Sequence, residues 1–134
     1  MLTDDGLFKL VVIDDEPDMA RLISDVADIS GYSVAAFFDP REFVSHYDDS
    51  VDVIFLDLIM PEMSGLEVIH FLVAQRSRAS LILMTGFNTD MLETAQEAAI
   101  SGNLNFVSGF RKPFRFDDLR SLLDELKKSL SPRP

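Results

Sequence analysis

The fold is indicated most clearly by one stretch of the sequence, Val53-Ile54-Phe55-Leu56-Asp57-Leu58-Ile59-Met60-Pro61. In it an apolar run of strand length ends in an acid, and turn-forming residues follow almost at once at Pro61, Ser64 and Gly65. We therefore expect Asp57 to lie where a buried strand reaches the surface. A carboxylate in that position would be ionised, accessible to solvent and held rigidly by the packed strand behind it.

Strand and helix patterns alternate along the rest of the chain. Short apolar runs predict strands at residues 8–13, 32–38, 52–56, 80–84 and 106–110. Apolar positions at helical spacing predict a short helix beginning at Asp39-Pro40 and further helices at residues 19–29, 65–74, 90–100 and 114–130. Asn88 or Thr89 is expected to cap the helix that begins near Asp90. Because parallel strands need crossovers that place helices on both faces, the alternation predicts a single α/β domain with a doubly wound, five-stranded parallel sheet.

Length and composition suit one globular domain. The chain has 134 residues, of which 47% are hydrophobic, and eleven Phe are enough to build one core. We expect the folded domain at residues 8–130, an N-terminal extension at residues 1–7, and a tail or the start of a linker at residues 131–134. The sequence has no Cys, no basic leader and no apolar run of membrane-spanning length. These features predict a soluble, cytoplasmic chain.

The charge balance is strongly acidic. Twelve basic residues stand against 23 acidic ones, which gives a formal charge of −11. Such a surface repels phosphate backbones and anionic lipid, so we expect no direct binding to nucleic acid or to membranes. Solubility accounts for most of the acids, but it does not account for acids at the ends of apolar strands.

Polar residues follow the predicted strands at their carboxyl ends. Asp14 and Asp15 come after the first strand, Asp57 ends the third, Thr85 ends the fourth, and Lys112 follows the fifth. Ligands of such sheets bind at this edge, so we expect the five side chains to share one rim. Three carboxylates within about 5 Å would repel one another by on the order of 3 kcal/mol per pair. Either some of them stay protonated with raised pKa values, or a divalent cation lies among them, and an all-oxygen environment favours Mg²⁺ or Mn²⁺ over zinc.

The same residue types suit phosphoryl transfer. A carboxylate beside a divalent cation, with the hydroxyl of Thr85 and the ammonium of Lys112 on the same rim, has the groups needed to receive a phosphoryl group. The metal and the lysine would neutralise the oxygens of the transferring group. We choose Asp57 as the acceptor, because it stands alone on the central strand whereas Asp14 and Asp15 form a pair.

Four motifs, in the same order, resemble those of the receiver domains of two-component response regulators. They are Val12-Ile13-Asp14-Asp15-Glu16, Asp57-Leu58-Ile59-Met60-Pro61-Glu62-Met63-Ser64-Gly65, Thr85, and Lys112-Pro113-Phe114. The resemblance covers about residues 9–126. It implies a flavodoxin-like (βα)5 fold with the strand order 2-1-3-4-5, and a signalling module rather than an enzyme.

The resemblance also implies how the acids act. Asp57 would be phosphorylated by the phosphohistidine of a histidine kinase or of a phosphotransfer protein. The carboxylates of Asp15 and Asp57 and the main-chain carbonyl of Ile59 would bind Mg²⁺, with Asp14 acting partly through water.

Further roles follow from the same resemblance. Thr85 would bond to a phosphoryl oxygen, Lys112 would pair with the phosphate, and Pro113 would follow a cis peptide bond. Output would run through the face formed by the fourth helix, the fifth strand and the fifth helix, which would also serve a homodimer. A fused or separate output domain would complete the regulator.

One position departs from that family pattern. Most members carry an aromatic residue three positions before the lysine, which rotates inward when the threonine engages phosphate, and here that position is Gly109. More residues separate Gly102 from Lys112 than in the usual family pattern, so we expect an extended loop at Asn103-Leu104-Asn105. Phe106 or Phe110 could take over the aromatic role, although strand alternation points Phe110 into the core.

Two other functions remain open. The first is a degenerate receiver that acts as a phosphorylation-independent protein-interaction scaffold; Gly109 supports it, whereas intact Asp57, Thr85 and Lys112 oppose it. The second is a Mg²⁺-dependent phosphatase with an aspartyl nucleophile. Such an enzyme would want a second acid two residues after the nucleophile, where this chain has Ile59.

Overall fold

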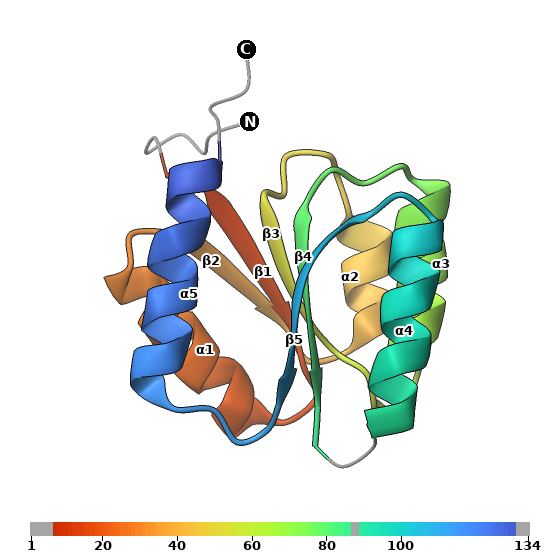
Figure 1. The fold of residues 1–134 in the computed structure, drawn as a ribbon, viewed down its shortest axis with the longest axis horizontal. Coiled ribbons are helices and arrows are strands. Elements are labelled where there is room, and N and C mark those ends of the chain that lie inside the picture. The colour runs from red at the N-terminus through yellow and green to blue at the C-terminus, as the bar shows by residue number, and fades with distance from the viewer. Residues whose placement is uncertain (1–6, 87–88, 131–134) are drawn as a thin grey trace.

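The computed structural model describes residues 7–86 and 89–130, and within them five strands alternate with five helices (Figure 1). The strands are β1 (Lys9–Ile13), β2 (Ser33–Phe37), β3 (Val53–Asp57), β4 (Ser80–Thr85) and β5 (Asn105–Arg111). The helices are α1 (Pro17–Ile29), α2 (Pro40–His46), α3 (Gly65–Ala74), α4 (Thr89–Ser101) and α5 (Phe116–Ser129). The predicted alternation is confirmed.

The strands form one parallel sheet in the order β2-β1-β3-β4-β5. Helices α1 and α5 cover one face, and α2, α3 and α4 cover the other (Figure 1). The chain leaves β1 for β2 on one side and then returns to β3 on the other, so the strand order reverses between β1 and β3. The predicted flavodoxin-like, doubly wound architecture is confirmed, and its reversal point lies beside Asp57.

Two apolar clusters, one on each face of the sheet, hold the helices in place. Neighbouring strand residues contribute to opposite clusters: Val11 and Ile54 belong to the cluster under α2, α3 and α4, whereas Val12 and Phe55 belong to the one under α1 and α5. All five residues of β3 are buried, as expected of a central parallel strand. This packing holds Asp57, the last residue of β3, in a fixed position.

The turn after Asp57 is closed by the start of α3. Gly65 donates its N–H to the carbonyl of Leu58 at 3.0 Å, and the side chain of Ser64 caps α3 by accepting the N–H of Glu67. A Cβ on Gly65 would lie 2.6 Å from the Cα of Leu58, a distance that real Cβ atoms do not show. The absence of a side chain at Gly65 therefore lets α3 approach the backbone that follows Asp57.

Strand β5 differs from the segment expected from the sequence. Its register against β4 shifts at Val107, because Phe106 and Ser108 pair with consecutive residues of β4. The extra residue makes a bulge within the strand. The connection from α4 to β5 covers only residues 102–104, and Asn105 already belongs to β5. The expectation of an extended loop before this strand is therefore wrong, since part of the added length lies inside the strand.

Some predictions fall outside the described residues. These are most of the N-terminal extension, the tail at residues 131–134 and the cap at Asn88; of Thr89, only the position at the start of α4 is described. Across residues 7–86 and 89–130, every helix is too short or too polar to span a bilayer.

Candidate functional site

The carboxyl ends of the strands bring the predicted residues to one rim of the sheet. Asp14 directly follows β1, Asp57 ends β3, Thr85 ends β4, and Lys112 directly follows β5. The ammonium nitrogen of Lys112 lies 2.9 Å from Asp14 Oδ2 and 3.2 Å from Asp57 Oδ2. Side chains from three separate strand ends are thus in direct contact, as expected from the predicted parallel sheet.

Lys112 is held toward the acids by its own backbone. Its N–H donates to the carbonyl of Thr85 at 2.8 Å, and the peptide bond that follows it is cis, as predicted. The side chain is only 9% exposed, and its ammonium also pairs with Glu16 at 2.9 Å. Burial lowers the pKa of Lys112, but the hydrogen bond to Glu16, the close ion pair with Asp14 and the charge of Asp57 outweigh it, so the pKa is raised overall. The ammonium therefore stays charged.

Asp57 is more enclosed than the sequence suggested. It is 3% exposed, so the expectation of a solvent-accessible carboxylate is wrong. The N–H of Ile59 donates to its Oδ1 at 3.3 Å. Burial, and then the neighbouring charge of Asp14, raise the pKa of Asp57 to about 7 although Lys112 lowers it. A single ammonium is thus too little positive charge to keep this carboxylate fully ionised near neutral pH.

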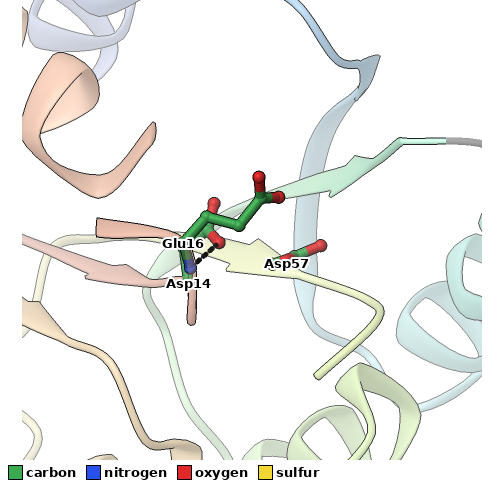
Figure 2. A group of neighbouring side chains, drawn as sticks. All are labelled: Asp14, Glu16 and Asp57. Carbon is green, nitrogen blue, oxygen red and sulfur yellow. Dashed lines mark hydrogen bonds between the residues drawn. The ribbon is translucent and has the colours of Figure 1, made fainter. Parts of the chain in front are cut away.

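Three acids lie close enough to share one cation (Figure 2). One oxygen from each of Asp14, Glu16 and Asp57 lies within 4.8 Å of the others. Glu16 was not predicted as a site residue, although it is the third acid in the run after β1; its N–H donates to Asp14 Oδ1 at 2.9 Å. The predicted ligand Asp15 is not part of this group. It is half-buried, and desolvation together with the charge of Asp14 raises its pKa.

The donor set fits a hard divalent cation. All the candidate ligands are oxygens, which Mg²⁺ and Mn²⁺ prefer. Asp14 is fully buried, and its Oδ2 has the ion pair with Lys112 but no well-formed hydrogen bond among the described residues. A buried carboxylate with spare acceptor capacity is suited to a metal or to its bound water. Ile59, whose carbonyl was predicted as a ligand, lies on the same turn two residues after Asp57.

Thr85 contributes a hydroxyl without a partner. Its side chain is fully buried, and Oγ1 has no hydrogen-bond partner within the described part of the chain. Leaving a buried polar group unpaired costs about 1–3 kcal/mol. Because Thr85 ends β4 next to the strand that carries Asp57, this hydroxyl is available to a ligand at the rim.

At Gly109, the face of β5 toward α4 is filled by Leu92 and Gln96 rather than by an aromatic ring. A Cβ on Gly109 would lie 2.8 Å from Gln96 Nε2 and 2.9 Å from Leu92 Cδ1. Phe106 packs on this same face, whereas Phe110 packs against the cluster under α1 and α5. The prediction that Phe110 points into the core is confirmed, so Phe110 does not replace the aromatic residue missing at Gly109.

Comparison with known proteins points to one family. Residues 10–124 match the family model described as the response regulator receiver domain. A solved response regulator from Colwellia psychrerythraea is similar, with 34% identity and a TM-score of 0.83 over 92% of this chain and 99% of that one. The BeF3-activated receiver domain of DrrB has a TM-score of 0.74 over 91% of this chain and 98% of that one; at 20% identity, this likeness shows the fold alone.

Curated relatives are longer regulators. The regulatory protein AtoC of Escherichia coli is 28% identical over 116 residues, which are 86% of this chain and 24% of that protein. The probable transcriptional regulatory protein TcrX of Mycobacterium tuberculosis is 29% identical over 119 residues, which are 85% of this chain and 49% of that protein. The chain therefore spans between about a quarter and about half of the length of these relatives.

Proposed function

The chain belongs to the family of response regulator receiver domains, the signalling modules of two-component systems, and from this premise we propose that Asp57 is its phosphoacceptor. The donor would be the phosphohistidine of a histidine kinase or of a phosphotransfer protein. The observation that supports this choice is the contact between Lys112 and Asp57 within an acidic cluster in which Asp14 and Asp57 are buried.

The transfer needs little covalent chemistry from the protein. An oxygen of Asp57 forms a bond to phosphorus while the bond between phosphorus and the donor imidazole breaks, and the imidazole leaves with the electron pair. Bound Mg²⁺ would supply positive charge for the oxygens of the transferring group. Lys112, fixed through its N–H on Thr85, would neutralise one phosphoryl oxygen, and the buried hydroxyl of Thr85 would donate to another.

We propose Mg²⁺, or Mn²⁺, as the cofactor. Its ligands would be the carboxylates of Asp15 and Asp57 and the carbonyl of Ile59, with Asp14 acting partly through water. Glu16 pairs with Lys112 at 2.9 Å, so in the metal-free protein it competes with Asp57 for the lysine. The cation would offset the negative charge that burial concentrates at the rim, including the charge that a phosphoryl group adds.

Mass spectrometry tests the proposal directly. Acetyl phosphate with Mg²⁺ is expected to add the mass of one phosphoryl group to the intact protein, and Asp57→Asn is expected to remove that addition. Asp28→Asn provides a matched control, because Asp28 is exposed on α1 and away from the rim. An unmutated protein that gains no Mg²⁺-dependent mass would refute the proposal.

A scaffold that works without phosphorylation is the second candidate. It is favoured by Gly109, where Leu92 and Gln96 fill the place that an aromatic side chain would need. The two functions differ in their response to beryllofluoride, which mimics the phosphoryl group. In a phosphorylation-dependent module, amide NMR signals of α4 and β5 shift when beryllofluoride binds; in a scaffold they do not.

The wider role of the chain follows from the same premise. We propose that the domain occupies residues 8–130, acts in the cytoplasm, and controls an output domain that is fused or separate. With a net charge of −11, it would bind neither nucleic acid nor membranes directly. A homodimer through α4, β5 and α5 is supported by Ile100 and Val107, which are 60% and 36% exposed. Sedimentation with beryllofluoride tests this dimer, which Ile100→Glu should weaken.

A further inference from the structure

A hollow of about 770 Å³ lies at the edge of the sheet opposite to Asp57. It is formed where α3 leads into β4 and α4 leads into β5, at the upper edge of the sheet in Figure 1. Two smaller hollows, of about 460 and 390 Å³, adjoin it and share Arg78. The phosphoacceptor site uses the carboxyl ends of the strands, so this feature has no part in that chemistry.

The charge in the hollow of about 770 Å³ is opposite to that of the chain. Arg76 and Arg78 line it and no acid does, although the chain has 23 acidic and 12 basic residues. Neither arginine makes an ion pair or a side-chain hydrogen bond within the described residues, whereas several other cations are paired: Lys9, Arg41, Lys112, Arg120 and Lys128. Asp52 lines the hollow of about 460 Å³, and Asp49 lines the hollow of about 390 Å³.

Arg76 is also held in an unfavourable backbone conformation. Its φ is +53°, in the left-handed region that glycine adopts most readily at the end of a helix. A residue with a side chain is less stable there by about 1–2 kcal/mol. Asn103 takes the equivalent position after α4 with φ +65°, but asparagine tolerates it better. No ion pair or side-chain hydrogen bond of Arg76 within the described residues offsets this cost.

Capping of the helices does not account for these arginines. The last carbonyls of α3 accept main-chain N–H groups, including those of Arg76 and Ser77, at 3.0 and 3.1 Å. Those of α4 likewise accept the N–H groups of Asn103 and Leu104, at 3.0 and 2.9 Å. The guanidinium groups are therefore not needed to satisfy the helix ends.

We propose that this hollow binds a small anion through a phosphate or carboxylate group. Two guanidinium forks suit the paired oxygens of either group, and the amide of Asn103 adds donors at the same lining, whereas the amide of Asn105 already donates to Ser80 Oγ at 3.1 Å. The volume is that of a small-molecule site. No aromatic residue lines the hollow, so a nucleobase would find no stacking partner. The ligand class is therefore a compact phosphate ester or polycarboxylate.

An NMR titration tests the site. Metal-free, ¹⁵N-labelled protein is titrated at constant ionic strength with pyrophosphate in one arm and with citrate in the other. Saturable shifts are expected in the amides of residues 76–78 and 101–105, and the arm with the tighter binding identifies the group recognised. Replacing both arginines, Arg76→Gln with Arg78→Gln, should weaken binding at least tenfold. Arg21→Gln, on the exposed side of α1, should leave it unchanged.

A second variant separates binding from folding. Arg76→Gly relieves the left-handed strain, so it should raise the thermal midpoint while it weakens anion binding. The proposal is overturned if neither anion gives saturable shifts, if the shifts appear only around Asp57, or if Arg21→Gln weakens binding as much as the double variant does. Retained affinity in Arg76→Gly combined with Arg78→Gln would overturn it equally.

Discussion

Lys112 Nζ lies 3.2 Å from Asp57 Oδ2, although 55 positions separate the two residues in the chain. The same ammonium lies 2.9 Å from Asp14, which is fully buried, and 2.9 Å from Glu16. One cation is thus shared among three acids. The metal-free rim carries an excess of negative charge that burial makes costly.

Removing the lysine should destabilise the metal-free protein. Lys112→Met leaves Asp14 and Asp57 without their shared counter-charge, and breaking a buried ion pair from one side costs about 3–5 kcal/mol. We expect a loss of that order in the free energy of unfolding, measured with urea in EDTA at pH 8. Lys128→Met is the matched control, since the exposed pair of Lys128 with Glu125 should contribute less than about 1 kcal/mol. Equal losses in both variants would contradict the buried pairing.

Removing the acceptor carboxylate should have the opposite effect. The folded pKa of Asp57 is raised from 3.8 to about 7, so the folded state keeps a proton that the unfolded state releases. The stabilisation that comes from this retained proton is therefore complete below about pH 4. It is lost as the pH rises through about 7, where the folded state also releases the proton. In EDTA, Asp57→Asn should be more stable than the unmutated protein by roughly 1–3 kcal/mol at pH 8. A difference that does not shrink toward pH 4 in urea unfolding would contradict this assignment.

Divalent cations should stabilise the fold through the same acids. A ligand at a hundred times its dissociation constant adds about 2.7 kcal/mol to the free energy of unfolding. We expect Mg²⁺ to raise the thermal midpoint, and Asp14→Asn and Asp15→Asn to reduce that rise. Glu16→Gln should reduce it less, because the Glu16 side chain is 63% exposed and is already paired with Lys112. If Glu16→Gln has the larger effect, the cluster in Figure 2 itself forms the metal site rather than the set with Asp15.

A methyl group at Gly65 should disturb the turn beside Asp57. Its Cβ would lie 2.6 Å from Leu58 Cα and 2.9 Å from the carbonyl oxygen of Asp57, both backbone atoms that cannot rotate away. Gly65→Ala should therefore lower the free energy of unfolding by about 1–3 kcal/mol. Gly86→Ala serves as its control, because a Cβ there meets nothing within 4 Å among the described residues. Chemical denaturation of both variants measures the difference.

Much of the fold was predictable because its elements are defined by local patterns. Helix α3 has the predicted bounds, and the buried strands were recognised by their continuous apolar runs. Strand β3 is shifted by one residue from the predicted range 52–56: it begins at Val53 and includes Asp57, which pairs with Met84. Strand β5 was predicted less well. Its bulge at Val107 depends on the register with β4, which no local pattern encodes.

The candidate site, like the fold, was only partly predictable from the sequence. The positions of Asp14, Asp57, Thr85 and Lys112 at one rim follow from parallel strand order, since residues at the carboxyl ends of parallel strands meet at one edge. Participation of Glu16 did not follow, because it depends on its side chain reaching Lys112 and lying within 4.8 Å of Asp14 and Asp57. The presence of Leu92 and Gln96 over Gly109 likewise depends on how α4 packs on β5.

Local periodicity was sufficient for the element order and for a parallel α/β sheet, because side-chain alternation and helical spacing are encoded by neighbouring residues; the strand order followed from the resemblance to receiver domains. Tertiary packing alone decided that Asp57 is buried, that its pKa rises, and that Arg76 and Arg78 share a hollow at the opposite edge. Burial and electrostatic energy are sums over atoms from segments that are distant in sequence. They therefore have definite values only once those segments are packed together.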